Sequence, residues 1–210
     1  MARPKALIVG GGSKLGLQLS TTIQDEYDVT IITSSGNVPT GMKIIPVDWN
    51  DMDSLSKLID AVETDYGLIV FNQNNGAGLQ KRHFKDELLE MSHWQHGYFV
   101  NCQLPYYIVK KQTQNCESKY VWMLTHFMEY RNRHEWNAKE FCSYGADKVT
   151  NAHIIKTFSF YGEGIFVGIV PDPTYRKTDQ TYIKKLKEVI LGLTIEDNGA
   201  IITENKEKFK

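Results

Sequence analysis

At residues 6–20 the chain reads ALIVGGGSKLGLQLS: a short apolar run, three glycines, and then apolar residues at helical spacing. A glycine-rich turn between a first strand and a first helix lets the backbone approach a diphosphate closely, and the helix N-terminus presents free N–H groups to its charge. Three consecutive glycines also cost backbone entropy that a plain turn seldom requires. The stretch predicts a nucleotide-binding unit, and a tight turn without a ligand is the alternative. We expect the phosphates to contact Gly10, Gly12, Ser13, Lys14, Leu15 and Gly16.

Short apolar runs alternate with segments of helical period along the rest of the chain. We expect strands at residues 6–9, 29–33, 42–47, 68–71, 120–124, 165–170 and 199–203, and helices at 15–25, 51–63, 86–91, 92–112, 144–160 and 179–193. This alternation is typical of an α/β fold whose parallel sheet is buried on both faces. Asp51 or Asp53 is the expected cap of the helix at 51–63. We expect one domain over residues 1–210, with a frayed lysine-rich end from Glu204.

The composition excludes several classes of protein. The 24 basic and 25 acidic residues give a formal net charge of -1, which provides no general attraction to nucleic acid or to an anionic membrane. The cysteines, Cys102, Cys116 and Cys142, are odd in number and lack a C-x-x-C spacing, which argues against a disulfide framework and a zinc site. The apolar run near the N-terminus is too short for a signal sequence or a membrane span. We therefore expect a cytoplasmic protein without a metal, a nucleic-acid partner or a membrane partner.

The end of the expected second strand bears on the type of cofactor. Dinucleotide enzymes that favour NAD usually have an Asp or Glu there, which binds the ribose 2'-hydroxyl, whereas this chain has Ser34 and Ser35. The two hydroxyls can bind a 2'-phosphate and Lys14 can supply a counter-charge, although a solvated lysine at a helix start has the same pattern. We therefore expect NADP in preference to NAD. Asp48 and Trp49 follow the third strand, where an adenine contact is expected; as a helix cap Asp48 would look the same.

Tyr144 and Lys148 form the second informative pattern. Residues four apart lie on the same face of a helix, so the phenol is expected beside the ammonium group. A positive charge stabilises a phenolate and lowers the pKa of a tyrosine toward the working pH, which suits it to exchanging a proton with a carbonyl oxygen. Tyr and Lys fall four apart by chance in many helices, so the pair gains its weight from the glycine loop upstream.

Taken in chain order, five motifs resemble those of the short-chain dehydrogenase/reductase family over nearly the whole length. The glycine loop follows the spacing G-x-x-x-G-x-G, with Lys14 at the middle glycine. The other motifs are Asn72 and Gln73 after the fourth strand, Asn101 ahead of Pro105, Tyr144-x-x-x-Lys148, and Pro171 to Thr174 after the sixth strand. Five motifs in order are hard to obtain by chance. The resemblance implies a Rossmann-like, doubly wound parallel sheet in three layers (α/β/α).

The resemblance also implies a role for each matched residue. Tyr144 would be the general acid and base, Lys148 would lower its pKa and bind the nicotinamide ribose, and Asn101 would hold a water that links Lys148 to solvent. The cofactor would carry the hydride chemistry while the protein supplies position and field. Further cofactor contacts are implied for Asn72, Gln73, Pro171 and Thr174.

Two departures from the family pattern bear on this chemistry. The family's catalytic serine falls on His126, with Thr125 one residue earlier. Thr125 could supply a hydroxyl, a neutral His126 could donate a hydrogen bond, or the site is degenerate. The segment at 127–142 is longer than usual and forms either a pocket wall or a packed surface loop. The segment at 171–180 is shorter than the usual substrate loop, which leaves a more open site and either weakens hydride transfer or suits a bulky substrate.

The sequence thus predicts an NADP-linked oxidoreductase that interconverts a small-molecule carbonyl and alcohol, or reduces a related C=N or C=C bond. A cofactor-binding protein with a degenerate site, acting as a redox sensor or interaction module, is the alternative, and a doubly wound protein without a dinucleotide is a third. The resemblance implies a homodimer or homotetramer through the helices at 92–112 and 144–160; alternatively their aromatic residues simply cover the sheet. Those residues are Tyr98, Phe99, Tyr106, Tyr107, Phe158 and Phe160.

Overall fold

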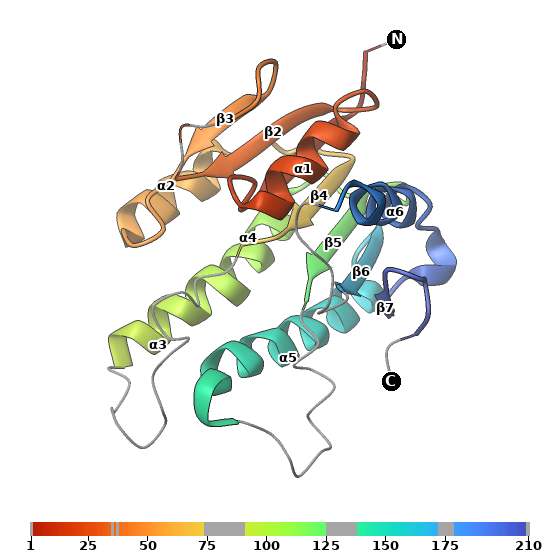
Figure 1. Ribbon diagram of the computed structural model, residues 1–210. Coiled ribbons are helices and arrows are strands. Elements are labelled where there is room, and N and C mark those ends of the chain that lie inside the picture. Colours follow the sequence, from red (N-terminus) through yellow and green to blue (C-terminus); the bar gives the residue numbers. More distant parts are fainter. Residues whose placement is uncertain are drawn as a thin grey trace.

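The computed structural model of the chain describes residues 2–34, 36, 38–73, 91–124, 138–171 and 179–208; at 91–94 and 138–145 it describes the backbone only. Within this part of the chain, seven strands form one parallel sheet in the order β3-β2-β1-β4-β5-β6-β7 (Figure 1). The strands are β1 Lys5–Val9, β2 Asp28–Thr33, β3 Lys43–Pro46, β4 Leu68–Phe71, β5 Lys119–Met123, β6 Ile165–Val170 and β7 Ile201–Thr203. Every predicted strand is confirmed, and the strand order reverses between β1 and β4.

Helices cover both faces of the sheet. They are α1 Lys14–Ile23, α2 Met52–Ala61, α3 Met91–Tyr98, α4 Leu104–Lys111, α5 Ala138–Tyr161 and α6 Gln180–Leu191, with a π-helical turn η1 Phe99–Gln103 and a 3₁₀ turn η3 Ile195–Asp197. Figure 1 shows α1 and α6 on one face and α2, α4 and α5 on the other. The predicted three-layer, doubly wound α/β fold is confirmed.

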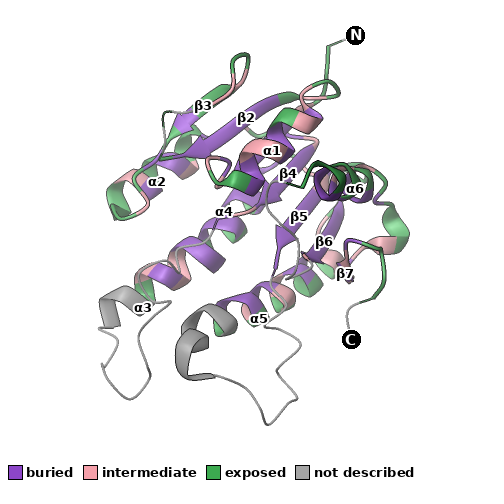
Figure 2. Cartoon of the chain, viewed as in Figure 1, coloured by how far each residue is buried: buried purple, intermediate pink, exposed green. Residues whose placement is uncertain are grey.

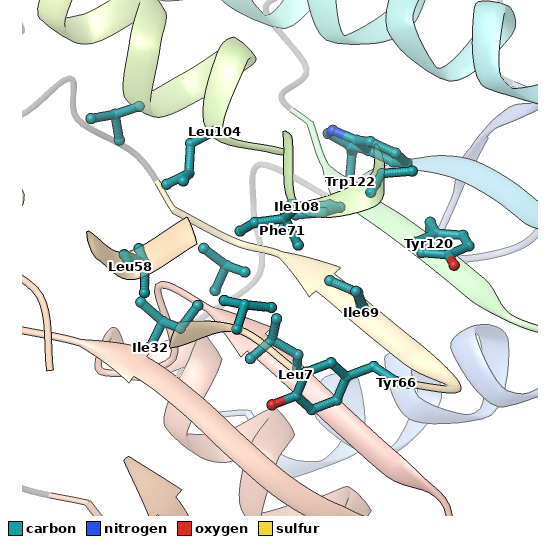
Figure 3. Close-up of a cluster of buried hydrophobic side chains, with 14 of the residues drawn as sticks. Leu7, Ile32, Leu58, Tyr66, Ile69, Phe71, Leu104, Ile108, Tyr120 and Trp122 are labelled. Carbon is teal, nitrogen blue, oxygen red and sulfur yellow. The ribbon is translucent and has the colours of Figure 1, made fainter. Parts of the chain in front are cut away.

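Two apolar layers, one on each side of the sheet, hold the helices in place. Successive side chains of a strand reach opposite faces, so Leu7 of β1 belongs to the layer under α2, α4 and α5, whereas Ile8 belongs to the layer under α1 and α6. This is why the inner strands read as unbroken apolar runs, and Figure 2 shows β1, β2, β4, β5 and β6 buried over most of their length. Figure 3 shows part of the first layer, in which Leu104 and Ile108 of α4 lie over Phe71 and Trp122.

An aromatic stack fixes α5 to the sheet. The rings of Tyr120 on β5 and Phe166 on β6 stack with centroids 4.8 Å apart, and Phe158 of α5 stacks on Phe166 at 5.4 Å. Tyr106 of α4 contacts Phe158 at 5.4 Å, so the stack also joins the two helices. Phe158 therefore covers the sheet, as one of the two alternatives predicted, whereas Tyr106, Tyr107 and Phe160 remain exposed.

Two of the predicted helices differ from their expected form. α5 begins at Ala138 rather than at Tyr144, because the residues at 138–143 contain no proline or glycine that would stop a helix. The expected loop at 127–142 is therefore helical over 138–142, while 127–137 lie outside the described residues. The predicted helix at 92–112 is interrupted by the wide turn η1, and the predicted helix at 86–91 lies outside the described residues apart from Met91.

The C-terminal segment is ordered to Lys208, so the expectation of a frayed end from Glu204 is wrong for this stretch. The backbone turns back on β7: the N–H of Thr203 donates to Glu207 O at 2.9 Å, and Ile202 pairs with Lys208 in an antiparallel bridge. These contacts pair backbone groups at one edge of β7, and Glu204 in the turn is buried. Among the described helices, none has both the length and the apolar character needed to cross a bilayer.

Candidate active site

The predicted site residues gather at the carboxyl ends of the strands, next to the point where the strand order reverses. Ligands of doubly wound sheets bind in the crevice at such a point. The glycine loop follows β1, Asn72 and Gln73 follow β4, and Lys148 of α5 donates from Nζ to the carbonyl oxygen of Met123 at the end of β5, at 3.1 Å. The topology thus places these elements at one edge of the sheet.

Backbone contacts determine the shape of the glycine loop. The N–H groups of Gly10 and Gly11 both donate to Ile32 O at 3.1 Å, which ties the loop to β2. Gly10 has a φ of +76°, a conformation that other residues rarely adopt. A Cβ on Gly16 would lie 2.7 Å from Gly11 Cα, so helix α1 rests directly on the loop. Glycine is therefore required at positions 10 and 16.

The N-terminus of α1 presents only hydrogen-bond donors. Ser13 is the N-cap, and its Oγ accepts from the N–H of Gly16 at 3.0 Å and from Asn72 Nδ2 at 2.7 Å. A hydroxyl that accepts two hydrogen bonds has its own proton left to donate. The N–H groups of Lys14 and Leu15 precede the first intrahelical bond, and no acceptor for them is found among the described residues. The loop therefore fits an anionic group such as a diphosphate.

Asn72 and Gln73 hold the edge of the site together. Asn72 Nδ2 also lies 3.3 Å from Gly10 O, so one amide fixes both the loop and its cap. The side chain of Gln73 is buried and donates to Val100 O at 3.3 Å, which joins the end of β4 to η1. Sequence reasoning assigned both residues to the cofactor; in the structure their side chains bind the surrounding backbone and Ser13.

The residues expected near the adenosine part of a cofactor lie after β2 and β3. Ser34 and Lys14 are exposed. Asp48 Oδ1 accepts from the N–H of Asn50 at 2.9 Å and forms a turn, while Asp51 is the cap of α2, with bonds from Asp53 N and Ser54 N. The half-buried Trp49 packs on the core, and its carbonyl lies 2.6 Å from His96 Nε2 on α3. A carbonyl can only accept, so His96 donates here, a contact that no sequence pattern indicated.

Lys148 is buried in the interior of the site, with 4% of its surface exposed. Burial lowers its pKa to about 8, and the nearby Cys102 and Asp147 act in the opposite direction. Because α5 is continuous from 138 to 161, position 144 lies one helical turn before Lys148. The side chain of Tyr144 and residues Ser35, Thr125, His126 and Thr174 lie outside what the structure describes; Pro171, directly after β6, is half-buried.

Three further side chains surround Asn101 on η1. Asn101 Nδ2 donates to Asp147 Oδ2 at 2.8 Å, Asn151 Nδ2 donates to Asn101 O at 3.0 Å, and Cys102 Sγ donates to Asp147 O at 3.3 Å. Asp147, Cys102 and Asn151 were not predicted. A signal was present: 147, 148, 151, 155 and 158 follow the spacing of one buried helix face, so the polar members of that stripe are expected in the interior.

Other features of the described residues do not contribute to this site. A surface pocket of about 700 Å³ is lined by Lys5, Gly67 and Lys119, which lie at or next to the amino ends of β1, β4 and β5, the opposite edge of the sheet from Lys148. Within the described ranges, no cluster of His, Cys, Asp and Glu is arranged to hold a metal ion.

Comparison with known proteins supports the fold. No protein-family model and no curated protein matches the sequence. The putative carbonyl reductase Sniffer of Caenorhabditis elegans matches over 100% of both chains, with 10% identity and a TM-score of 0.76. The NADPH-bound carbonyl reductase from chicken fatty liver matches over 100% of this chain and 99% of its own, with 11% identity and a TM-score of 0.77. A putative short-chain dehydrogenase/reductase from Burkholderia multivorans with bound NADP matches over 98% of each chain, with 13% identity and a TM-score of 0.74.

At these low identities the likeness establishes the fold. The chain has the fold of the short-chain dehydrogenases/reductases, as the five sequence motifs predicted.

Proposed function

We propose that the protein is an NADP-dependent oxidoreductase of the short-chain dehydrogenase/reductase type. It interconverts a small-molecule carbonyl and alcohol, or reduces a related C=N or C=C bond, with Tyr144 as general acid and base. The observation that carries this proposal is the buried Lys148, one helical turn after Tyr144 and bonded to the carboxyl end of β5. The NADPH- and NADP-bound structures of the same fold support a nicotinamide cofactor.

The glycine loop is the proposed binding site of the cofactor's diphosphate. The Ser13 hydroxyl and the N–H groups of Lys14 and Leu15 are donors directed to an anion, and Asn72 holds Ser13 in place. The nicotinamide cofactor supplies the hydride when it is bound. The exposed Ser34 and Lys14 favour NADP, because no carboxylate follows β2 to repel a 2'-phosphate. Titration with NADPH and NADH measures this preference.

The proposed role of Lys148 is to supply positive charge to the phenol of Tyr144. With a pKa of about 8, the Lys148 side chain is mainly an ammonium ion at neutral pH. An ammonium ion one turn away stabilises the phenolate and so brings the tyrosine closer to the pKa that proton exchange requires. Asn101, bonded to both Asp147 and Asn151, holds η1 against α5 beside this pair.

Tyr144→Phe tests the proposal directly. We expect turnover of a panel of aldehydes and ketones with NADPH to fall by about 10²-fold or more, because general acid catalysis contributes about that much. The dissociation constant of NADPH is expected to change little, since the phenol hydroxyl serves the substrate. Tyr161→Phe, at an exposed position of the same helix, is the matched control. Unchanged turnover of the Tyr144→Phe variant would remove Tyr144 from the mechanism.

The degenerate dinucleotide-binding protein remains the second candidate, and the departure at Thr125 and His126 favours it. NADPH binding by the unmodified protein without turnover of any compound in the panel is the outcome that selects it.

We also infer a cytoplasmic homodimer or homotetramer. Cys102 and Cys116 are free thiols, which suits a reducing compartment. Large aromatic side chains on α4 and α5 are exposed, which suits a contact with a second copy.

A further inference from the structure

Asp147 is an ionisable residue in a buried position, where a charge is costly in free energy. It directly precedes Lys148 on α5 and has 4% of its surface exposed. Moving a carboxylate out of water costs several kcal/mol unless hydrogen bonds and an opposite charge compensate it. A small or apolar residue would avoid that cost at a helix position that faces the core. The contacts of Asp147 indicate what the carboxylate does there.

The carboxylate fixes the amide of Asn101. Asp147 Oδ2 accepts from Asn101 Nδ2 at 2.8 Å, and an ionised carboxylate can only accept, so the amide must present its NH₂ group to it. The backbone carbonyl of Asn101 accepts from the side-chain amide of Asn151, and the thiol of Cys102 donates to the backbone oxygen of Asp147. These three bonds join η1 to α5 on both sides of Lys148 in the sequence.

The charges near Asp147 come from two elements. Lys148 lies on its own helix, and Cys102 is the titratable group on the facing turn η1, where Asn101 is neutral. Burial raises the pKa of Asp147, while the bond from Asn101 and the charge of Lys148 oppose this shift. Burial and the charge of Asp147 raise the pKa of Cys102 to about 12, so the thiol carries no charge at neutral pH. Cys102 and Asp147 both favour the charged form of Lys148, and of the two Asp147 also holds the Asn101 amide.

We propose that Asp147 is a positioning residue of the active site: its carboxylate orients the Asn101 amide and keeps Lys148 in the ammonium form. This inference rests on the proposed function, in which the ammonium group of Lys148 acts on Tyr144. Asp147 is then a buried counter-ion that extends to higher pH the range over which Lys148 is charged.

Two substitutions separate the two effects of Asp147. Asp147→Asn keeps an oxygen that can accept from Asn101 Nδ2 but removes the charge, and its shape is the same, so the fold is retained. Asp147→Ala removes both the charge and the acceptor. Glu163→Gln is the matched control, because it removes one negative charge from an exposed position just beyond α5.

The first measurement is the titration of Lys148 itself, followed by the ¹³Cε resonance of lysine-labelled full-length protein. The signal of Lys148 is assigned by its loss in Lys148→Arg. We expect Asp147→Asn to lower the midpoint, since the negative charge of Asp147 favours the protonated form of Lys148. Glu163→Gln is expected to leave the midpoint where it is. An unchanged midpoint in Asp147→Asn overturns the electrostatic part of the proposal.

The second measurement is the pH profile of kcat with NADPH and a carbonyl substrate. In Asp147→Asn the alkaline limb is expected to move to lower pH by the same amount as the Lys148 midpoint, with kcat in the acidic range nearly unchanged. In Asp147→Ala kcat is expected to fall at every pH, because the Asn101 amide has lost its acceptor; equal profiles for the two variants overturn the orienting role. If the unmodified protein turns over nothing, the proposed function fails, while the Lys148 titration still decides whether Asp147 keeps the ammonium charged.

Discussion

Lys148 shows what the proposed chemistry requires of a single residue. Its Nζ donates to the carbonyl oxygen of Met123 from a buried position, and burial alone would favour the neutral amine. The nearby carboxylate of Asp147 compensates part of that effect. A charged lysine held in the core is a cost in stability that serves the site, so its removal should stabilise the fold.

Lys148→Met is expected to increase the free energy of unfolding at pH 7. The pKa of Lys148 is about 8 in the folded protein against 10.5 for an ordinary lysine, so the charged form is held at a cost on the order of 3 kcal/mol. Lys148→Met removes this cost but also loses the hydrogen bond to Met123 O, which is worth about 1 kcal/mol. The free energy of unfolding is therefore expected to rise by about 2 kcal/mol.

The pH dependence gives the sign of this effect. Above pH 8 the folded protein releases the proton of Lys148 while the unfolded chain keeps it up to about 10.5, so the wild-type protein gains stability as the pH rises through that window. The advantage of Lys148→Met is therefore complete below pH 8 and lost by about pH 10.5. Urea unfolding of both proteins at a series of pH values measures the difference. Lys156→Met, at an exposed position of α5, is the control, and a pH-independent difference for Lys148→Met would contradict the argument.

At the scale of elements, the strands were predictable and the details of the helices were not. A buried parallel strand is a short apolar run, and the runs at 68–71 and 165–170 coincide with β4 and β6. The wide turn η1 changes the helical period by about one residue over a single turn, which a pattern of apolar spacing does not resolve. Yet this turn carries Asn101. The bond of Asn101 to Asp147 links positions 46 residues apart, and such pairing depends on tertiary packing.

The motifs of the site were likewise predictable only in part. The glycine loop and the spacing of Tyr144 and Lys148 are local patterns, so they can be recognised in the sequence. The clamp of Asn72 on Ser13 joins positions 59 residues apart and arises from the neighbouring positions of β1 and β4 in the sheet. His96, which donates to the Trp49 carbonyl, belongs to the same class of contact.

Two glycines in helices illustrate how packing overrides propensity. In isolation, Gly→Ala inside a helix stabilises by about 1 kcal/mol. At Gly16 of α1 the added Cβ would lie 2.7 Å from Gly11 Cα and 2.8 Å from Gly10 O, all backbone atoms of the loop. Gly97 of α3 is buried, but no described atom lies within 4 Å of the added Cβ.

We therefore expect Gly16→Ala to lower the free energy of unfolding by about 2 kcal/mol or more, and Gly97→Ala to raise it by about 0.5–1 kcal/mol. Because Gly16→Ala displaces the loop, the affinity for NADPH should fall by about tenfold or more, whereas Gly97→Ala should bind it normally. Urea unfolding and fluorescence titration measure the two quantities. A Gly16→Ala protein with normal stability and normal NADPH affinity would show that the close approach of α1 to the loop has no function.

At the scale of the whole molecule, the two faces of the sheet are covered unequally. On the side of α1 and α6 the described apolar residues are mostly buried, whereas on the other side aromatic residues of α4 and α5 remain in solvent (Figure 2). We call this set the aromatic face: Tyr106, Tyr107, Phe160 and Tyr161. Phe160 is 81% exposed and Tyr161 is 88% exposed, which is unusual for side chains of this size. Exposed aromatic side chains of this size are typical of a surface that another protein covers.

The aromatic face predicts self-association of the unmodified protein at micromolar concentration. Large aromatic residues bury about 150–250 Å² each when fully covered, and Tyr106 and Tyr107 are less than half exposed, so the four residues of two copies account for about 1,000 Å² of the roughly 1,600 Å² that stable interfaces bury. Tyr107→Lys combined with Phe160→Glu places charges in the centre of that contact and should yield a monomer, with the far-ultraviolet circular dichroism unchanged because both side chains are exposed.

Light scattering after gel filtration measures the mass of each variant. Ile44→Lys is the control, because Ile44 is also an exposed apolar residue but lies on the edge strand β3, away from α4 and α5. If the unmodified protein is a monomer at this concentration, the predicted self-association is wrong. If it is an oligomer that both sets of substitutions leave intact, the contact lies elsewhere on the molecule. Dissociation by the double variant alone assigns the interface to α4 and α5, the helices next to Asn101 and Lys148, and so joins assembly to the geometry of the proposed active site.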